Sequence, residues 1–173
     1  MSGEAAMLVV MGVSGVGKTT VGEAIAKRLQ WAFIDGDELH PAANIAKMKA
    51  GIPLTDADRT PWLDAVAAWI DRQHDEGRPG VVTCSALKRA YRDRLDAGRP
   101  QVRFVYLQLD QADVAKRIAG RKGHFFAPAL LASQFADLEP PQDDEPVIVV
   151  DGAQPIAAQV DAVVARLGNQ TAS

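Results

Sequence analysis

The feature that most constrains the fold of this chain is a glycine-rich segment, residues 12–19, that follows a short apolar run. It reads Gly-Val-Ser-Gly-Val-Gly-Lys-Thr, and residues 7–11 before it read Met-Leu-Val-Val-Met. Glycines allow consecutive backbone N–H groups to turn inward, which forms a nest for phosphate oxygens at the start of a helix. A glycine-rich turn with an incidental lysine is disfavoured by the strand before the segment and the helical pattern after it. The spacing therefore predicts a site for a nucleoside triphosphate.

The polar positions of this loop have distinct expected roles. Lys18 is expected to reach the β- and γ-phosphates and to act in catalysis, and the Thr19 hydroxyl is placed to ligate Mg²⁺. The nucleotide-binding residues expected in the loop are Gly12, Ser14, Gly15, Val16, Gly17, Lys18, Thr19 and Thr20.

Length and composition restrict the class of protein. A chain of 173 residues suits one domain, and a net charge of −3 argues against nucleic-acid binding as its main role. The single cysteine, Cys84, excludes an intramolecular disulfide and fits a reducing cytoplasm. The first apolar run is too short for a membrane span and continues directly into the phosphate loop. These observations predict a cytoplasmic protein without a membrane segment.

Apolar runs predict five strands, at residues 7–11, 31–34, 81–84, 102–109 and 146–150. Helical patterns are expected to begin after Lys18, near Pro41, at Thr60, at Lys88, around Val114 and at Pro155. We expect Thr60 to cap the third helix with Pro61 as its first residue, and Ile156 to face the core. Apolar strands that alternate with helices predict an α/β fold, a three-layer α/β/α domain over residues 1–173 with a parallel sheet.

The carboxyl ends of parallel strands share one edge of the sheet, and ligands bind there. By this rule, four segments are expected to meet at that edge: the phosphate loop, Asp35-Gly36-Asp37, Cys84-Ser85 and Asp151-Gly152. Asp35 ends the second strand and is expected to hold the metal or to act as base, whereas Asp37 is expected to contact substrate hydroxyls. The order of these two carboxylates stays open at this stage, and a plain turn-forming role for Asp35 is the alternative.

Two insertions into the predicted α/β fold indicate which class of phosphate-loop protein this is. The first insertion, residues 36–62, carries the strings D-G-D-x-L-H-P (residues 35–41) and D-x-D-R-x-P-W-L (residues 56–63), which extend one residue beyond it at each end. Residues 84–93 read C-S-A-L-K-R-x-Y-R-D, and the second insertion, residues 121–145, contains S-Q-F-x-x-L-E. An Asn-Lys-x-Asp sequence that would read guanine is absent. Over about residues 8 to 152, these strings closely resemble the gluconokinase family of small phosphate-loop kinases. The departures are small: the loop has Val16 and Thr19 where serines are more usual, and Phe126-Ala127 replaces a methionine-containing string.

The resemblance implies a fold like that of nucleoside-monophosphate kinases, with residues 36–62 binding substrate and residues 121–145 forming a mobile lid. It implies transfer of the γ-phosphoryl group of ATP, with Mg²⁺, to the 6-hydroxyl of D-gluconate. The family also implies a homodimer. We expect neither a nucleic acid nor a membrane as a partner. A kinase of the same fold acting on another small acid or polyol, such as shikimate, and a nucleotide sensor without catalysis are the alternatives.

A sugar acid needs cations for its carboxylate and hydrogen-bonding groups for its hydroxyls. The expected substrate-binding residues are Asp37, His40, Lys47, Arg59, Ser85, Lys88, Arg89, His124 and Gln134. His40 has a helix-capping or packing role as its alternative, and Arg59 has a surface salt bridge with neighbouring aspartates. Arg92, one turn after Lys88, is expected to be solvated.

The basic segment around residues 117–124 is expected to cover the transferring phosphoryl group. Arg121 is assigned to catalysis and, with Arg117, to nucleotide binding, because an arginine can neutralise charge on that group. A solvated basic helix end is the alternative. Cys84 is expected to be a buried thiol and not a nucleophile, and the loop from Asp151 to Pro155 is expected to lie near the adenine.

Overall fold

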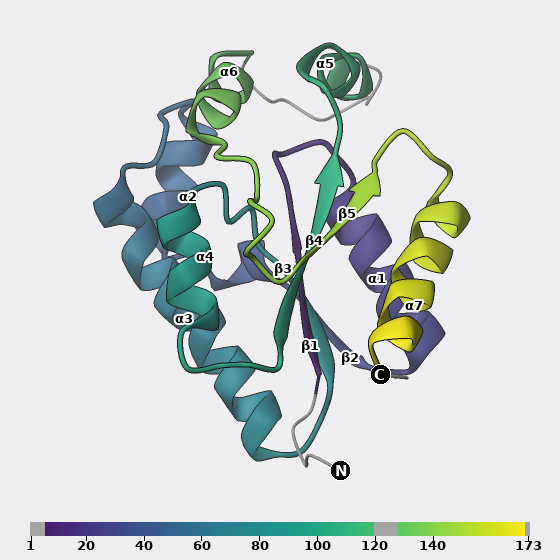
Figure 1. Cartoon of the computed structure of the whole chain (residues 1–173). Helices are drawn as coiled ribbons and strands as arrows, with labels where there is room; N and C mark the ends of the chain where they lie inside the picture. The colour runs from purple at the N-terminus through teal and green to yellow at the C-terminus, as the bar shows by residue number, and fades with distance from the viewer. Residues whose placement is uncertain (1–5, 120–127, 172–173) are drawn as a thin grey trace.

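A parallel sheet forms the centre of the computed structural model, which describes residues 6–119 and 128–171 (Figure 1). Within these ranges, five strands pair in the order β2-β3-β1-β4-β5, and all four pairings are parallel. The strands are β1 (Met7–Met11), β2 (Ala32–Asp35), β3 (Gly80–Thr83), β4 (Val102–Gln108) and β5 (Val147–Asp151). Every residue of β1, the middle strand of this order, is buried.

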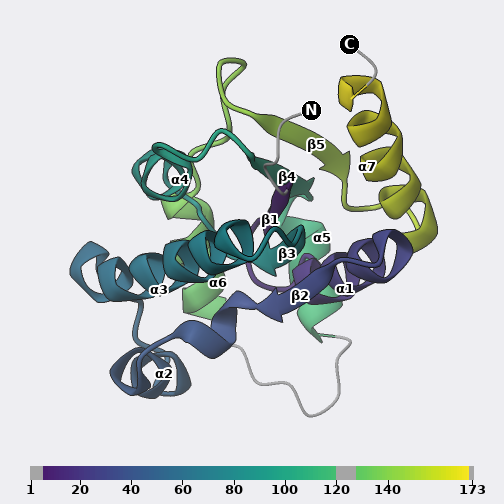
Figure 2. The ribbon, with the colours of Figure 1, turned by 90° about the horizontal axis from the view of Figure 1, so that it is seen from below.

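Helices cover both faces of the sheet (Figures 1 and 2). The helices of the described residues are α1 (Lys18–Leu29), α2 (Ala42–Lys49), α3 (Asp56–Asp75), α4 (Arg89–Asp96), α5 (Gln111–Ala119), α6 (Pro128–Asp137) and α7 (Ile156–Thr171), with a short 3₁₀ turn η1 (Gly36–Leu39). Apolar residues of α1 and α7 form one core with the sheet, and those of α3 and α4 form a second core on the opposite face. The predicted three-layer α/β fold is therefore confirmed.

The start of α3 differs from the prediction. The helix begins at Asp56, four residues before Thr60, and Pro61 lies inside it. A reciprocal capping box explains the difference: the Thr55 hydroxyl accepts from the Asp58 N–H, and the Asp58 carboxylate accepts from the Thr55 N–H. Two satisfied backbone donors outweigh the single hydrogen bond that Pro61 cannot make.

The structure differs from the predictions at α6 and at Ile156. No helix was predicted over residues 128–137, where the structure has α6. Ile156 was expected to face the core, but it is 40% exposed because it begins α7 and lines a cavity. None of the helices in the described ranges combines the length and apolarity needed to span a bilayer.

Candidate nucleotide and acceptor site

The phosphate loop leaves β1 at the carboxyl edge of the sheet, as its sequence predicts. Gly15 and Gly17 have φ of 87° and 98°, a left-handed conformation in which a side chain would be strained. The Gly12 N–H donates to the Ser85 carbonyl oxygen at 3.2 Å, so the loop is attached to the segment that follows β3. The loop thus has the glycine-dependent shape that a phosphate nest requires.

Lys18 lies folded over this loop. Its Nζ donates to the Gly12 and Val13 carbonyl oxygens at 2.9 and 3.0 Å, which holds the ammonium group beside the backbone N–H nest. Burial lowers the pKa of Lys18, while the nearby carboxylates of Asp37 and Asp35 oppose that shift. Burial disfavours the charged form of Lys18, and phosphate oxygens bound in the nest would stabilise it.

Asp35 is oriented by three donors at the end of β2. Its Oδ2 accepts from the Thr19 hydroxyl at 3.1 Å, and its Oδ1 accepts from the Thr83 hydroxyl at 3.0 Å and the Asp37 N–H at 2.9 Å. Gly36 permits this arrangement, since a Cβ there would lie 1.8 Å from the Thr83 carbonyl oxygen. A hydroxyl and a carboxylate in contact fit Mg²⁺, which takes one or two protein oxygens besides water and phosphate.

A cavity of about 370 Å³ lies beside the phosphate loop, and Arg117 forms part of its wall. The guanidinium of Arg117 donates to the Gly152 carbonyl oxygen at 2.7 Å and to the Val16 carbonyl oxygen at 3.3 Å. The cavity is lined by residues of the loop, α1, α5 and the turn into α7: Val16, Gly17, Val21, Arg117, Ala153, Gln154, Pro155, Ile156 and Gln159. This position, next to the loop from Asp151 to Pro155, is the one expected for the base of a bound nucleotide.

The helix α6 joins the phosphate loop to α3. Gln134 accepts from the Ser14 N–H at 2.6 Å and donates to the Ser14 hydroxyl at 3.0 Å. Asp137 accepts from the Arg59 guanidinium at 3.2 Å. Residues three apart lie on the same side of a helix, so a single turn of α6 spans the distance from the nucleotide loop to Arg59. The structure thus places Gln134 on the phosphate loop.

Two cations flank the ring of Tyr91 at the α3–α4 junction. The Arg59 guanidinium carbon and the Lys88 Nζ lie 5.5 and 5.7 Å from the ring centre. The Tyr91 hydroxyl accepts from Arg59 at 3.0 Å and donates to Asp56, which also accepts from Lys88 at 3.0 Å. Hydrogen bonds from Tyr91 and Lys88 lower the pKa of Asp56. We call these four residues the cation cluster.

His40 lies close enough to Arg59 of the cation cluster for the two charges to interact. Its ring stacks on Trp62, with centroids 4.1 Å apart and an interplanar angle of 13°. Burial lowers its pKa; the charge of Asp37 raises it and that of Arg59 lowers it. Since Asp37 also acts on Lys18, the electrostatic neighbourhood is continuous from the loop to Arg59.

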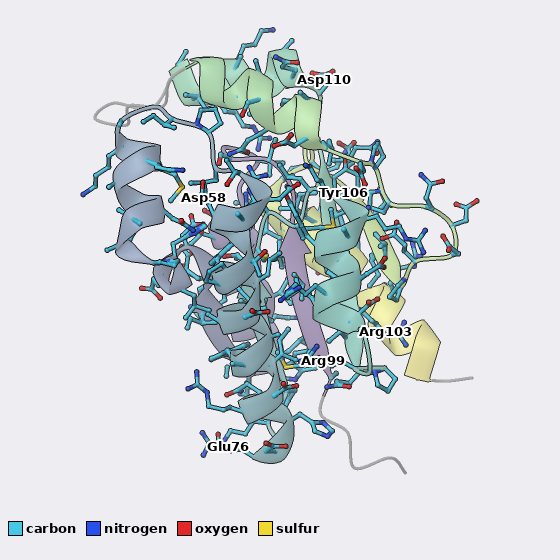
Figure 3. The ribbon with its side chains drawn as sticks, turned by 90° about the vertical axis from the view of Figure 1, so that its left-hand side faces the viewer. Asp58, Glu76, Arg99, Arg103, Tyr106 and Asp110 are labelled. Carbon is cyan, nitrogen blue, oxygen red and sulfur yellow. The ribbon has the colours of Figure 1, made fainter. Side chains whose placement is uncertain are left out.

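Other predicted site residues are engaged elsewhere. Lys47 pairs with Asp58 at 2.7 Å. Figure 3 shows Asp58 in the upper half of the molecule, below the level of Asp110. Arg89 forms a two-point ion pair with Asp144, at 2.9 and 2.8 Å. The structure does not bring Lys47 and Arg89 into the cation cluster. Arg121 and His124, with the rest of residues 120–127, lie outside the described residues.

The expectation that Arg92 is solvated was wrong. Its side chain is 1% exposed and pairs at 2.6 Å with Glu145, whose side chain is 4% exposed. Arg92 also donates to the carbonyl oxygens of Ala86, Leu87 and Glu139. A buried cation of this kind requires a counter-charge and several acceptors, which here come from the β3–α4 loop and from the distant segment between α6 and β5.

Some site residues had little or no sequence signal. Thr83 orients Asp35 from β3, and Asn44 contacts His40 from α2, yet neither residue type in isolation indicates such a role. Tyr91 had a usable signal, because it follows Lys88 by three residues in a helical pattern and therefore lies on the same face. Cys84 is 1% exposed and burial raises its pKa to about 12, which agrees with the expected inert thiol.

Comparison with known proteins gives a consistent result. Residues 7–141 match a family model described as an AAA domain. A gluconokinase of Gluconobacter oxydans is 52% identical over 145 residues, 84% of this chain and 82% of that protein. The thermosensitive gluconokinase of Escherichia coli is 48% identical over 149 residues, 86% of this chain and 79% of that protein.

A solved structure agrees with these sequence relatives. The crystal structure of a gluconokinase from Sinorhizobium meliloti superposes with a TM-score of 0.86 at 46% identity, covering 95% of this chain and 93% of that chain. With the glycine-rich loop, the parallel sheet and the charged edge in place, the conclusion is direct: this chain belongs to the gluconokinase family.

Proposed function

We propose that this protein is an ATP-dependent gluconokinase, which transfers the γ-phosphoryl group to the 6-hydroxyl of D-gluconate and forms 6-phospho-D-gluconate and ADP. One observation carries the proposal: a single turn of α6 joins the phosphate loop, through Gln134, to the cation cluster, through Asp137 and Arg59. A small anionic acceptor held by that cluster would lie within reach of a nucleotide on the loop.

The nucleotide end is assigned from the loop outward. The N–H groups of the loop and Lys18 would bind the β- and γ-phosphates, and the base would enter the cavity walled by Arg117. Thr19 and Asp35 would hold Mg²⁺, which when bound neutralises charge on the phosphate oxygens. Arg121 remains our candidate for charge stabilisation during transfer.

The acceptor end is assigned from the cation cluster inward. In the free protein, Asp137 and Asp56 occupy Arg59 and Lys88, so an incoming carboxylate would take over contacts of the same chemistry. Asp37 acts electrostatically on both His40 and Lys18, and Arg59 acts on His40, so we assign His40 and Asp37 to the hydroxyls of the acceptor. Within the described residues the Asp37 side chain has no hydrogen-bond partner, which leaves its oxygens for the acceptor.

Phosphoryl transfer passes through a loose, in-line transition state, so positioning and charge stabilisation dominate. Lys18 would hold the transferring group, Asp37 would orient the acceptor hydroxyl, and Asp35 would fix the metal side. We also propose a cytoplasmic location and a homodimer; light scattering on the purified protein tests the second point.

The test is ADP release from ATP and Mg²⁺ with D-gluconate, shikimate, glucose, AMP or no acceptor. We expect gluconate alone to stimulate release strongly and Lys18→Ala to abolish it while the circular dichroism spectrum is unchanged. Stimulation by shikimate or another acceptor instead would reject the substrate assignment. ATP binding without stimulation by any acceptor would favour a nucleotide sensor.

A further inference from the structure

The side chain of Asn44 has a fixed orientation beside His40. Asn44 is 3% exposed, and its Nδ2 donates to the Asp58 carbonyl oxygen at 2.8 Å. Because a backbone carbonyl only accepts hydrogen bonds, the amide nitrogen, and not the amide oxygen, must face α3. The same Nδ2 lies 3.2 Å from the Nδ1 of His40, toward which it directs its second hydrogen.

This geometry determines the protonation of the His40 ring. A nitrogen that faces an N–H donor must accept, so Nδ1 is unprotonated and the neutral ring carries its proton on Nε2. The ring is held in plane by its stack on Trp62, whose own Nε1 donates to the Gly36 carbonyl oxygen at 2.8 Å. Asn44 and Trp62 therefore fix both the tautomer and the orientation of the imidazole.

In the part of the chain that the structure describes, the Nε2–H of His40 is a donor without a protein acceptor. Within the described ranges no hydrogen bond from Nε2 is formed, and the three side-chain atoms that are buried without a partner belong to other residues: Gln73, His74 and Gln159. The donor is thus neither satisfied nor sealed in the core. The ring is within electrostatic range of both Asp37 and Arg59, in the region assigned above to the hydroxyls of the acceptor.

The charged groups around His40 come from two elements. Asp37 on η1 favours the imidazolium form, whereas burial and Arg59 on α3 oppose it, and the net effect lowers the pKa of His40 from 6.5. A proton on Nδ1 would also face the amide hydrogens of Asn44, and two donors that face each other repel. The contacts from α2 and α3 therefore both favour a neutral ring at neutral pH.

We propose that Asn44 is a positioning residue that holds His40 as the neutral Nε2–H tautomer, and that this N–H donates to a hydroxyl oxygen of the acceptor. The inference rests on the proposed function, since it names the specificity element of the same acceptor site. A neutral N–H can donate to a hydroxyl without attracting the carboxylate of the acceptor, as a protonated imidazolium would. Arg59 and Lys88 therefore remain the groups that bind the carboxylate. An acceptor that lacks the matched hydroxyl would leave the donor unpaired.

The tautomer can be read without any activity assay. Long-range ¹H–¹⁵N correlation spectra of the ¹⁵N-labelled full-length protein separate the nitrogens of its three histidines, and His40→Phe assigns the signals of His40. We expect a protonated-type Nε2 and an unprotonated-type Nδ1 at pH 7.5. A proton on Nδ1, or an imidazolium at that pH, overturns the inference.

The role of Asn44 is tested by Asn44→Asp, whose carboxylate would accept from Nδ1–H. Above the raised pKa of His40 the proton would then lie on Nδ1 and the donor to substrate would be lost, so the KM for gluconate should increase with pH. The wild-type KM should show no such change between about pH 6 and 8. Ala43→Asp, which adds the same charge at an exposed neighbouring position, is the matched control and should resemble the wild type. Equal pH profiles for a folded Asn44→Asp and the control overturn the role of Asn44.

The hydroxyl contact is tested with monodeoxy gluconates, which also covers the case in which Asn44→Asp does not fold. His40→Phe keeps the stack on Trp62 but removes the donor. For one deoxy acceptor, the wild-type kcat/KM should fall about 3- to 10-fold, the range of one neutral hydrogen bond, with no further loss in His40→Phe. Equal losses in both proteins for every deoxy acceptor overturn the contact. An absence of gluconate turnover in the wild type would instead reject the proposed function, while the spectra would still report the tautomer.

Discussion

Arg59 and Lys88 carry the same charge in the cation cluster but are held differently. The Arg59 side chain is 9% exposed and contacts both Tyr91 and Asp137, whereas the Lys88 side chain is 28% exposed and has Asp56 as its carboxylate partner. A buried, planar guanidinium has a defined direction for a carboxylate, while an ammonium on a flexible stem does not. Arg59 is therefore the residue on which acceptor binding should depend most.

We expect Arg59→Lys to increase the KM for gluconate about 10- to 100-fold, the range of one charged hydrogen bond, with little change in the KM for ATP. Steady-state kinetics with each substrate varied in turn measures both values. Arg28→Lys alters an exposed ion pair with Asp161 and should leave both constants unchanged. Equal increases in the two KM values for Arg59→Lys would contradict a role confined to the acceptor.

At the scale of single elements, α3 and α6 each place charged side chains at the proposed acceptor site. The start of α3 places Asp56 beside Lys88 and Tyr91, and it places Asp58 beside Lys47. The helix α6 contacts Ser14 and Arg59 from one side. The position of each helix terminus therefore decides which charges meet.

The capping box of α3 predicts a difference between two threonines. Thr55→Ala should lower the free energy of unfolding by about 1 kcal/mol, because the Thr55 hydroxyl caps the Asp58 N–H. Thr60→Ala should change it by less than about 0.5 kcal/mol, since Thr60 lies within the helix and donates only to the Asp56 carbonyl oxygen. Urea denaturation compares the two variants. A larger loss for Thr60→Ala would place the helix start where the sequence alone suggested.

The contact between α6 and the phosphate loop gives a second prediction at this scale. Gln134→Leu removes two hydrogen bonds to Ser14, so kcat/KM for ATP should fall about tenfold, while the melting temperature changes little. Gln142→Leu, on an exposed segment beyond α6, serves as a control for the loss of an amide. An unchanged kcat/KM in Gln134→Leu would show that α6 does not position the loop.

The elements were predictable to different degrees. The strands and the inner face of α3 followed from apolar patterns, and Leu63, Val66 and Ile70 are buried as expected. The start of α3 was missed because Pro61 is a strong local signal, whereas the competing capping box depends on a reciprocal pair of contacts. The position of Asp137 against Arg59 was not predictable, since it joins residues that are 78 positions apart in sequence.

At the scale of the whole molecule, the buried Arg92–Glu145 pair connects the β3–α4 loop to the segment between α6 and β5. Arg92 donates to Ala86, whose φ of 46° is unfavourable for a residue with a side chain, and to Leu87, directly before Lys88. It also holds Glu139 and Glu145, in the segment between α6 and β5. One buried side chain thus joins the β3–α4 loop to the return segment after α6.

Removal of one partner should leave the other charge buried without compensation. Arg92→Met is expected to lower the free energy of unfolding by about 3–5 kcal/mol, as measured by urea denaturation, and the double variant Arg92→Met/Glu145→Leu should lose less. Arg94→Met, which alters the exposed pair with Asp64, should cost at most about 1 kcal/mol. A loss of similar size in the Arg92 and Arg94 variants would contradict the structural role of the buried pair.

The same pair predicts a pH dependence. Burial alone would raise the pKa of Glu145, but hydrogen bonds from Arg92 and the Gln142 N–H hold it below its usual value of 4.5. A lowered carboxyl pKa stabilises the protein fully above the unfolded-state value, and this contribution is lost as the pH falls through the folded-state pKa. The difference in unfolding free energy between the wild type and Glu145→Gln should therefore shrink from about pH 6 to about pH 3. A difference that grows toward acid pH would contradict the assigned direction.

We propose that gluconate binds with its carboxylate at Arg59 and Lys88 and its 6-hydroxyl toward the phosphate loop. A crystal structure with gluconate and a non-hydrolysable ATP analogue tests it most directly. We expect the gluconate carboxylate to contact Arg59 and Lys88 in place of Asp137 and Asp56, and the 6-hydroxyl to lie between Asp37 and the γ-phosphate. Gluconate bound with its carboxylate toward Lys18, or outside the space between α6 and α3, would contradict it.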